Sequence, residues 1–300
     1  MEKMRNVLVP DDIDFNYYLA QSDAEEKVRP AGDYLDAVMH VIAPAYDAPK
    51  NPRMPFANCF VEFRPGEVTL WAGYNGSGKS MLQGQIMALF AEKEPVCIAS
   101  FEMKPERTIA RLTRQMLQHG NPPREKVREY LDSTDGKLWL YDHRGSVQAE
   151  RVIAMTKHCA EKLECKHIAI DSLMKCVRGE DDYNGQKDFV DAMTRAAHDY
   201  NVHIHLVHHL RKEDSAATGK LPGKMDVKGS GAITDLVDNV LILWRNKKKE
   251  QDTEYGAQVD KNDPDAVLIC DKQRNGEWEG RTKLYFSRTS MRYSDVPLIV

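Results

Sequence analysis

The sequence predicts an α/β fold with a mostly parallel central sheet. From residue 56 onward, short apolar runs alternate with longer amphipathic segments, which is the pattern of βαβ units. The apolar runs are continuous, as expected of strands that are buried on both faces. Of the 300 residues, 42% are hydrophobic and 29% are charged, which is typical of a globular protein with a sizeable core. No apolar stretch approaches the roughly 18 residues of a transmembrane helix.

Residues 1–55 are predicted to form an N-terminal arm, and residues 56–300 the main domain. The arm carries acidic clusters at residues 11–14 and 23–26 and four prolines after residue 43. Between them, residues 32–42 place apolar side chains along one face of a short amphipathic helix. That face must be buried, and two alternatives remain open: the helix docks on its own domain or on a neighbouring subunit.

The elements of the main domain follow from the same patterns. Strands are expected at residues 68–72, 96–101, 138–141, 167–170, 202–207, 239–244 and 266–270, and helices at residues 79–93, 106–119, 147–163 and 186–200. Six cysteines form no C-x-x-C pair, so they are expected to be reduced thiols of a cytoplasmic protein.

A phosphate-binding loop connects the first expected strand to the first expected helix. Residues 73–80 read G-Y-N-G-S-G-K-S and fit the pattern G-x-x-x-x-G-K-[ST] in the strand–loop–helix context that it requires. Lys79 is expected to reach the β- and γ-phosphates, and the Ser80 hydroxyl to ligate Mg²⁺. The cofactors predicted are ATP or another NTP or dNTP, with Mg²⁺. The loop residues predicted to hold the nucleotide are Gly73, Asn75, Gly76, Ser77, Gly78, Lys79 and Ser80.

Two carboxylates follow expected strands and suit nucleotide hydrolysis. Asp171 ends an apolar strand and is predicted to hold Mg²⁺, directly or through water. Glu102 ends another strand and could orient the water that attacks the γ-phosphate. From composition alone, a Glu without a catalytic role remains an alternative.

Six motifs occur in one order along the chain. They are the phosphate loop, S-F-E-M at residues 100–103, Asp171, H-L-R at 209–211, D-V-K-G-S-G-A at 226–232 and K-Q-R-N-G at 272–276. In this order they resemble the RecA-like helicase domain of DnaB-like replicative helicases, especially phage-type primase–helicases and the related mitochondrial helicase Twinkle. The resemblance covers residues 56–293. It implies a RecA-like P-loop NTPase core that assembles into a homo-hexameric ring, threads single-stranded DNA and unwinds duplex DNA by NTP hydrolysis.

The resemblance also implies roles for individual residues. Glu102 matches the catalytic glutamate and His209 the γ-phosphate sensor of the family. Arg274 matches the arginine finger that is supplied in trans to the neighbouring subunit's nucleotide, and Lys272 lies beside it. Arg245 and Phe286 fall where the family contacts the nucleotide base.

Residues 211–232 resemble the DNA-binding loop that lines the central channel in this family. Cations interleaved with glycines can present charge and backbone amides to phosphates. Apart from the resemblance, a solvated loop without DNA contacts is the alternative. Residues 175–186 are acidic and are assigned no DNA contacts. The predicted DNA-binding residues are Lys220, Lys224, Lys228, Gly229 and Ser230.

The formal net charge of −4 by itself argues against a protein coated by nucleic acid. A ring removes this objection, because only the loops that line its channel need to be basic. His203 and His205 alternate on one strand and are predicted to be buried in the sheet rather than to bind a metal.

Two other functions remain as alternatives: a RecA or branch-migration type recombination ATPase, and a nucleotide-switched DNA-binding or loading protein. The first fifty-odd residues are too few for a catalytic primase domain, so a separate primase or replisome protein is a possible partner. The expected location is the cytoplasm of a bacterial or phage-infected cell, with an organelle matrix as the alternative. No membrane partner is expected.

Overall fold

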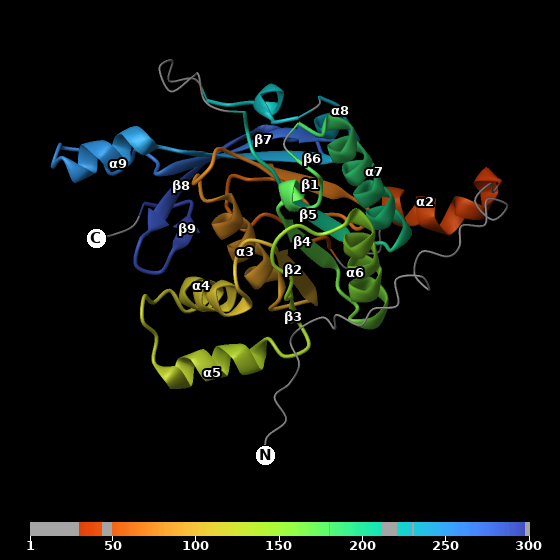
Figure 1. The fold of residues 1–300 in the computed structure, drawn as a ribbon, viewed down its shortest axis with the longest axis horizontal. Coiled ribbons are helices and arrows are strands. Elements are labelled where there is room, and N and C mark those ends of the chain that lie inside the picture. The colour runs from red at the N-terminus through yellow and green to blue at the C-terminus, as the bar shows by residue number, and fades with distance from the viewer. Residues whose placement is uncertain (1–29, 44–49, 180, 212–220, 230, 298–300) are drawn as a thin grey trace.

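The computed structural model describes residues 30–43, 50–179, 181–211, 221–229 and 231–297 (Figure 1). A nine-stranded sheet runs through the domain in the order β3-β2-β4-β5-β1-β6-β7-β8-β9. The six strands from β3 to β6 are parallel, and β7, β8 and β9 add in antiparallel fashion. The strands are β1 Val68–Ala72, β2 Val96–Ser100, β3 Leu138–Tyr141, β4 His167–Asp171, β5 His203–Val207, β6 Asn239–Arg245, β7 Ala266–Gln273, β8 Gly280–Ser287 and β9 Arg292–Ser294.

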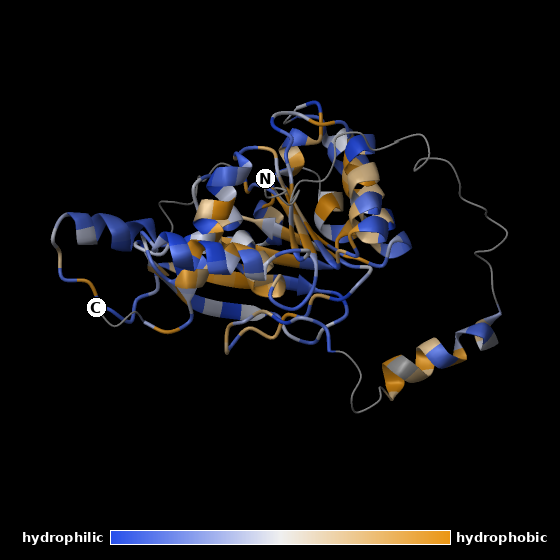
Figure 2. Cartoon of the chain, turned by 90° about the horizontal axis from the view of Figure 1, so that it is seen from below, coloured by the Kyte–Doolittle hydropathy of each residue, from blue (hydrophilic) through white to orange (hydrophobic). Residues whose placement is uncertain are grey.

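Helices cover both faces of this sheet (Figures 1 and 2). One face packs against α6, α7 and α8, and the other against α3 and α4, and each interface has its own cluster of buried apolar side chains. Because both faces are covered, β1, β2, β4 and β5 are buried along their whole length. The helices are α2 Leu35–Ile42, α3 Lys79–Phe90, α4 Pro105–Leu117, α5 Arg124–Ser133, α6 Ala149–Lys162, α7 Tyr183–Asp199, α8 Gly231–Leu236 and α9 Lys247–Glu254.

The strand order places the predicted motifs along one edge of the sheet. β5 lies between β1 and β4, and β2 lies on the far side of β4. Since these strands are parallel, the segments that follow them all emerge at the same edge. The phosphate loop follows β1, Asp171 ends β4, and Glu102 and His209 follow β2 and β5. We call this the phosphate edge.

The α/β prediction is confirmed, and all seven expected strands and all four expected helices of the main domain are present. Their ends shift by up to three residues. The prediction missed α5, α8, α9, β8 and β9. The reason is their weak apolar pattern: α5 buries only Tyr130 among its residues, α9 buries none, and β8 alternates buried positions with Arg281 and Lys283.

The expected helix in the N-terminal arm is present as α2, preceded by a 3-10 turn at Ala31–Tyr34. Its apolar side chains are exposed, from 44% for Val38 to 80% for Val41. The structure therefore does not show this helix docked on its own domain, which was one of the two alternatives. None of the described helices combines the length and the apolar character that crossing a membrane requires.

Candidate active site

The phosphate loop has the backbone shape that its glycines predict. Gly76 and Gly78 have φ of +74° and +92°, a backbone conformation that residues with a Cβ rarely adopt. Gly78 is the residue before the first turn of α3, so the loop leads straight into the helix N-terminus. At Gly73, an added Cβ would lie 2.5 Å from Ser77 Oγ and 2.7 Å from the Leu243 carbonyl oxygen. The loop thus has the fold of an anion cradle, with backbone amides and a helix dipole at its centre.

Lys79 is held inside this cradle. Its Nζ donates to the Tyr74 carbonyl at 3.1 Å and lies 3.3 Å from Nδ1 of His209. Burial lowers the pKa of Lys79 to about 8, and the carboxylates of Asp171 and Glu102 oppose that shift. A phosphate would add the negative charge that this buried ammonium lacks.

Asp171 has the properties of a metal ligand. It is buried at the end of β4, it interacts with the Ser80 hydroxyl, and burial raises its pKa. Among the described residues its Oδ1 has no hydrogen-bond partner. A buried carboxylate oxygen without a partner beside a serine hydroxyl fits the hard oxygen ligands that Mg²⁺ prefers. The predicted pair of Ser80 and Asp171 is therefore brought together.

Glu102 and His209 face a common hollow of about 950 Å³ next to the phosphate loop. Glu102 is exposed, and the Ser172 hydroxyl donates to its Oε1 at 3.4 Å. Asn75 of the phosphate loop lines the same hollow. An exposed carboxylate beside the Lys79 ammonium can accept a proton from a water molecule, as nucleotide hydrolysis requires.

A second cavity, of about 430 Å³, lies on the other side of the phosphate loop. It is lined by Gly76 and Gly78, by Arg245 and by Phe286, so the two predicted base contacts converge there. Arg245 donates to the Gly76 carbonyl at 2.8 Å and to Glu250 of α9 at 2.6 Å. The sequence did not indicate that α9 takes part, because that helix buries no residue.

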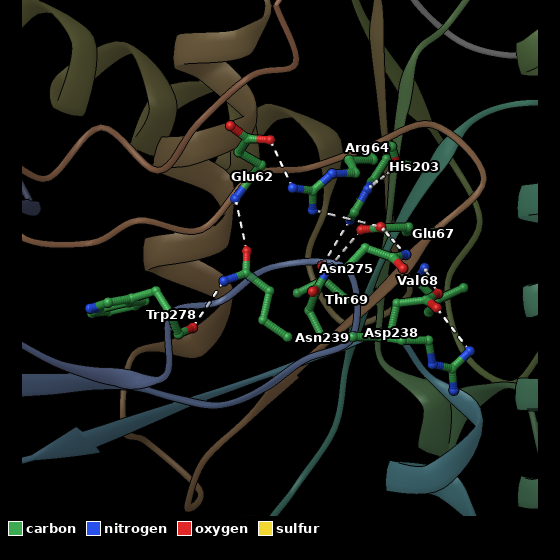
Figure 3. Close-up of polar contacts among 12 residues, drawn as sticks. Glu62, Arg64, Glu67, Val68, Thr69, His203, Asp238, Asn239, Asn275 and Trp278 are labelled. Carbon is green, nitrogen blue, oxygen red and sulfur yellow. Dashed lines mark hydrogen bonds and ion pairs between the residues drawn. The ribbon is translucent and has the colours of Figure 1, made fainter. Parts of the chain in front are cut away.

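Lys272 pairs with Val240 near the start of β6, so it and Arg274 lie at the opposite edge of the sheet, which we call the finger edge. Figure 3 shows Asp238, Asn239 and Asn275 of this edge. The Arg274 amide donates to the Asp238 carbonyl, and the Asp238 carboxylate accepts from the Val68 amide at the start of β1. The phosphate loop follows the other end of β1. Five residues at about 3.3 Å each separate the two ends by roughly 17 Å. Arg274 therefore cannot reach the phosphates bound by its own chain without a large rearrangement.

The family model for the DnaB-like helicase C-terminal domain matches residues 56–295. The chain belongs to this family. The match covers the whole sheet, both cavities and both edges, so every predicted site residue lies inside the DnaB-like domain.

Relatives agree with this placement. A DNA helicase/primase of Enterobacteria phage T3 is 23% identical over 205 residues, which cover 62% of this chain and 36% of that protein. The chain thus spans about a third of the length of this relative. A solved structure of an ATPase domain superposes with a TM-score of 0.72 at 15% identity, over 90% of this chain and 100% of that one. A DnaB-like replicative helicase, whose structure was described with its interactions with primase, gives 0.68 at 15% identity, over 90% and 69%. The DnaB-like domain therefore has the RecA-like fold that the resemblance implied.

The predicted DNA loop of the DnaB-like domain is described in part. Lys220 and Ser230 lie outside the described residues. Lys228 and Gly229 line the same hollow as Glu102 and His209, and Lys224 is exposed nearby in the chain. The Lys228 amide donates to the His209 carbonyl at 2.9 Å, which ties this segment to the predicted sensor.

Sequence reasoning missed cations near the hollow. Lys175 and Arg178 line it, although the segment that contains them is acidic overall. The acids have a different position: Asp182 caps the N-terminus of α7 by accepting from the Gly185 amide at 3.0 Å. The net charge of residues 175–186 therefore does not show that the cations stand at the start of the segment, beside the hollow, and the acids at its end, beside α7.

Arg111 of α4 was also missed. Its guanidinium donates to the Ser80 carbonyl at 3.2 Å and to Met103 Sδ at 3.3 Å, and its charge favours the ionised form of Asp171. In the sequence it lies between Arg107 and Arg114 on an amphipathic helix, where arginines usually point to solvent. Only the tertiary structure identifies it as a support of the phosphate loop.

Buried histidines occupy the finger edge, as predicted for His203 and His205. His203 Nε2 lies 2.8 Å from the Thr69 hydroxyl, and its Nδ1 donates to the Arg64 carbonyl at 2.7 Å. His205 Nε2 lies 3.0 Å from His167 Nδ1. In the described part of the chain, no group of three or more His, Cys, Asp or Glu side chains is arranged to hold a metal ion.

Proposed function

We propose that this chain is the motor of a ring-shaped replicative DNA helicase, which uses NTP hydrolysis to move along single-stranded DNA and to unwind duplex DNA. The carrying observation is the hollow that Glu102 and His209 share with Lys228 and Gly229. In it, the residues suited to sense and hydrolyse a nucleotide adjoin the cation suited to a DNA phosphate. Family membership supports the same function.

The chemistry follows from the positions of the side chains. The phosphate-loop amides and Lys79 would bind the β- and γ-phosphates, and Glu102 would orient the attacking water and accept its proton. Ser80 and Asp171 would hold Mg²⁺, which when bound neutralises phosphate charge. Arg245 and Phe286 would contact the base. Arg111 would support the phosphate loop without touching the nucleotide, because its guanidinium donates to the Ser80 carbonyl and fixes the backbone there.

His209 would couple the nucleotide to DNA. Its ring contacts Lys79, and its backbone carbonyl accepts from the Lys228 amide. We call residues 221–229, the described part of the predicted DNA loop before α8, the DNA-facing segment. A change in phosphate charge at Lys79 would therefore reach this segment through His209 alone. Lys220, Lys224, Lys228, Gly229 and Ser230 would bind the DNA backbone, and the positions of Lys175 and Arg178 add two further phosphate contacts.

The finger edge supports assembly into a homo-hexameric ring. Arg274 would stabilise the charge that develops on the γ-phosphate of the neighbouring subunit's nucleotide, with Lys272 beside it. The exposed apolar face of α2 would dock on a neighbouring subunit rather than on its own domain. A separate primase or replisome protein would be the further partner, in the cytoplasm of a bacterial or phage-infected cell.

Unwinding of a forked DNA duplex tests this function. The full chain with Mg²⁺ and NTP should separate the strands, and it should require a 5′ single-stranded tail if movement runs 5′ to 3′ as the family implies. Lys79→Ala should abolish unwinding, because the buried ammonium that meets the phosphates is gone. Lys93→Ala, an exposed lysine near the end of α3, is the matched control.

The outcomes separate the alternatives. DNA-dependent NTP turnover with strand pairing and no unwinding would indicate a recombination ATPase. Nucleotide-dependent DNA binding with hydrolysis too slow to support movement would indicate a loading protein. Either result would overturn the helicase proposal.

A further inference from the structure

Helix α8 lies between the DNA-facing segment and the finger edge. Its first residue, Gly231, comes two residues after Gly229, and its last residue, Leu236, comes two residues before Asp238. Ile233 and Thr234 are buried, and the helix packs against α7. Because the helix is short and anchored in the core, its two ends must shift together or not at all.

Lys272 holds the C-terminal end of α8. Its Nζ donates to three backbone carbonyls, those of Thr234 at 2.8 Å, Asp235 at 3.0 Å and Val237 at 2.7 Å. The first two carbonyls belong to the group that a helix leaves without partners at its C-terminus, where a cation is also favoured by the helix dipole, and the third follows the helix directly. The ammonium has three donors, and all three are committed to this helix end.

Arg274 is attached to the same helix end. Its guanidinium donates to the Asp235 carbonyl at 2.7 Å and to the Leu236 carbonyl at 3.3 Å, and it forms an ion pair with the Asp238 carboxylate at 3.0 Å. The next residue, Asn275, donates to buried Glu67 at 2.7 Å (Figure 3). The position of the finger therefore depends on where the end of α8 lies.

The N-terminal end of α8 is in contact with the DNA-facing segment. Gly229 has φ of +99°, and a Cβ there would lie 2.9 Å from the side chain of Ile233 and 2.3 Å from that of Gln186 on α7. Lys228, one residue earlier, is hydrogen-bonded to His209. If Lys228 moves when it binds a DNA phosphate, the contact between Gly229 and Ile233 would therefore shift the N-terminal end of α8.

We propose that α8 couples the DNA-facing segment to the finger, and that Lys272 is a positioning residue that makes this coupling rigid. DNA contact at Lys228 and placement of Arg274 toward the neighbouring nucleotide then depend on each other. The proposal rests on the proposed helicase function and adds a path from DNA bound by one subunit to hydrolysis in the next. Since coupling between two sites is reciprocal, loosening the finger end must change DNA affinity at the other end.

Single-stranded DNA affinity of the full chain with a non-hydrolysable NTP analogue tests this coupling. Lys272→Met keeps the length of the side chain but removes its donors from α8. Without these hydrogen bonds the C-terminal end of α8 is less ordered in the free protein. Because it must then become ordered when DNA binds, the affinity for single-stranded DNA should fall about fivefold. Lys283→Met, an exposed lysine on β8, should leave it unchanged. The analogue is kept at saturation and ring assembly is confirmed by mass for each variant, so that a lost contact with the neighbouring γ-phosphate cannot by itself lower the DNA affinity.

Asp238→Asn provides a second variant that keeps an acceptor for the Val68 amide, removes the ion pair with Arg274 and takes away a negative charge that also favours the Lys272 ammonium. It should lower DNA affinity in the same direction. If both variants melt at the wild-type temperature and both bind DNA with wild-type affinity, the coupling does not exist. If the wild-type chain itself fails to bind single-stranded DNA with nucleotide, the proposed function fails instead.

Discussion

The phosphate edge and the finger edge are built in different ways. At the phosphate edge, backbone amides and glycines form the cradle, and a few charged side chains point into it. At the finger edge, a network of mostly buried side chains forms the structure. Glu67 accepts from buried Asn239 and from exposed Asn275, Asn239 also donates to the Thr69 hydroxyl, and that hydroxyl contacts His203 (Figure 3).

This difference indicates how the proposed catalytic groups would be divided. Under the proposed function, the phosphate edge would lack only a cation that stabilises the developing charge from outside. The finger edge carries such a cation, Arg274, and its described residues form no phosphate cradle. Each chain would then carry two incomplete halves of an active site, and a neighbour arranged head to tail would join them.

Subunit mixing is the largest test of this division. Arg274→Ala should lower NTP hydrolysis by about 10³-fold or more, and Lys79→Ala should abolish it. In rings mixed in equal parts, a site of the Arg274→Ala subunit can receive a finger from a Lys79→Ala neighbour. Hydrolysis should then recover to about a quarter of the wild-type rate, because half of the sites are intact and half of those have a neighbour with a finger.

The control for mixing is a combination of Arg274→Ala with Lys79→Ala in the same chain, added to either single variant. Mixed rings must be confirmed by mass. No recovery in confirmed mixed rings of the two single variants would show that Arg274 acts within its own chain or not at all, and the comparison of the two edges would lose its meaning.

The two edges also differ in how well the sequence predicts them. The phosphate loop needs glycines at fixed spacing, because only they adopt its φ values, so residues 73–80 are recognisable without a structure. The finger edge needs only mutual hydrogen bonds among Glu67, Asn239 and Asn275, which come from three distant parts of the chain. No local pattern marks them. Strand alternation predicted the buried His203 and His205, and a family resemblance pointed to Arg274 and Lys272.

The same reasoning applies to the fold. Strands buried on both faces leave continuous apolar runs, so β1 to β7 were predicted to within three residues at each end. Antiparallel β8 and the exposed helix α9 have one covered face or none, and their sequences resemble loops. Yet Glu250 of α9 lines the cavity of about 430 Å³ where Arg245 and Phe286 meet, which we call the base cavity. An element with a weak sequence pattern therefore carries part of the candidate site.

Lys228 lines the hollow at the phosphate edge with Glu102 and His209, and its loss should give the next largest effect. Lys228→Ala should weaken single-stranded DNA binding about tenfold at low salt and reduce the salt dependence by about one ion, since one phosphate contact is lost. The Lys224→Ala variant shows whether a cation four residues earlier contributes equally. Hydrolysis without DNA should stay near the wild-type rate. An unchanged salt slope would return this segment to a solvated loop without DNA contacts.

The finger edge should be sensitive to acid because its histidines are buried. Burial lowers the pKa of His203 and of His205 well below the usual value. The unfolded chain binds their protons below pH about 6.5, whereas the folded chain does not, so stability is fully present above that value and is lost as the pH falls below it. Between the pKa of the unfolded chain and that of the folded chain, each such histidine lowers the free energy of unfolding by about 1.4 kcal/mol for each pH unit of acidification.

Urea unfolding between pH 7.5 and 5 measures this loss. His203→Gln keeps a donor for the Arg64 carbonyl and an acceptor for the Thr69 hydroxyl but does not titrate, so its stability should fall less steeply with acid than that of the wild type. His119→Gln, at an exposed position, should follow the wild-type curve. Equal slopes for all three proteins would mean that the buried histidines do not determine the acid sensitivity.

The smallest effect is expected at the base cavity of the phosphate edge. Glu250 binds the Arg245 guanidinium and raises its pKa, and Lys249 holds α9 in place through an ion pair with Asp265 at 2.8 Å. Glu250→Gln keeps the shape of the side chain but loses the charge, so Arg245 must be ordered when the base binds. KM for the nucleotide should rise about threefold with kcat unchanged, which is the sign of a lost uniform binding contact. Glu125→Gln, at an exposed position on α5, should change neither. A lower KM in Glu250→Gln would instead show that the ion pair withholds Arg245 from the base, and that this contact must break before the nucleotide binds.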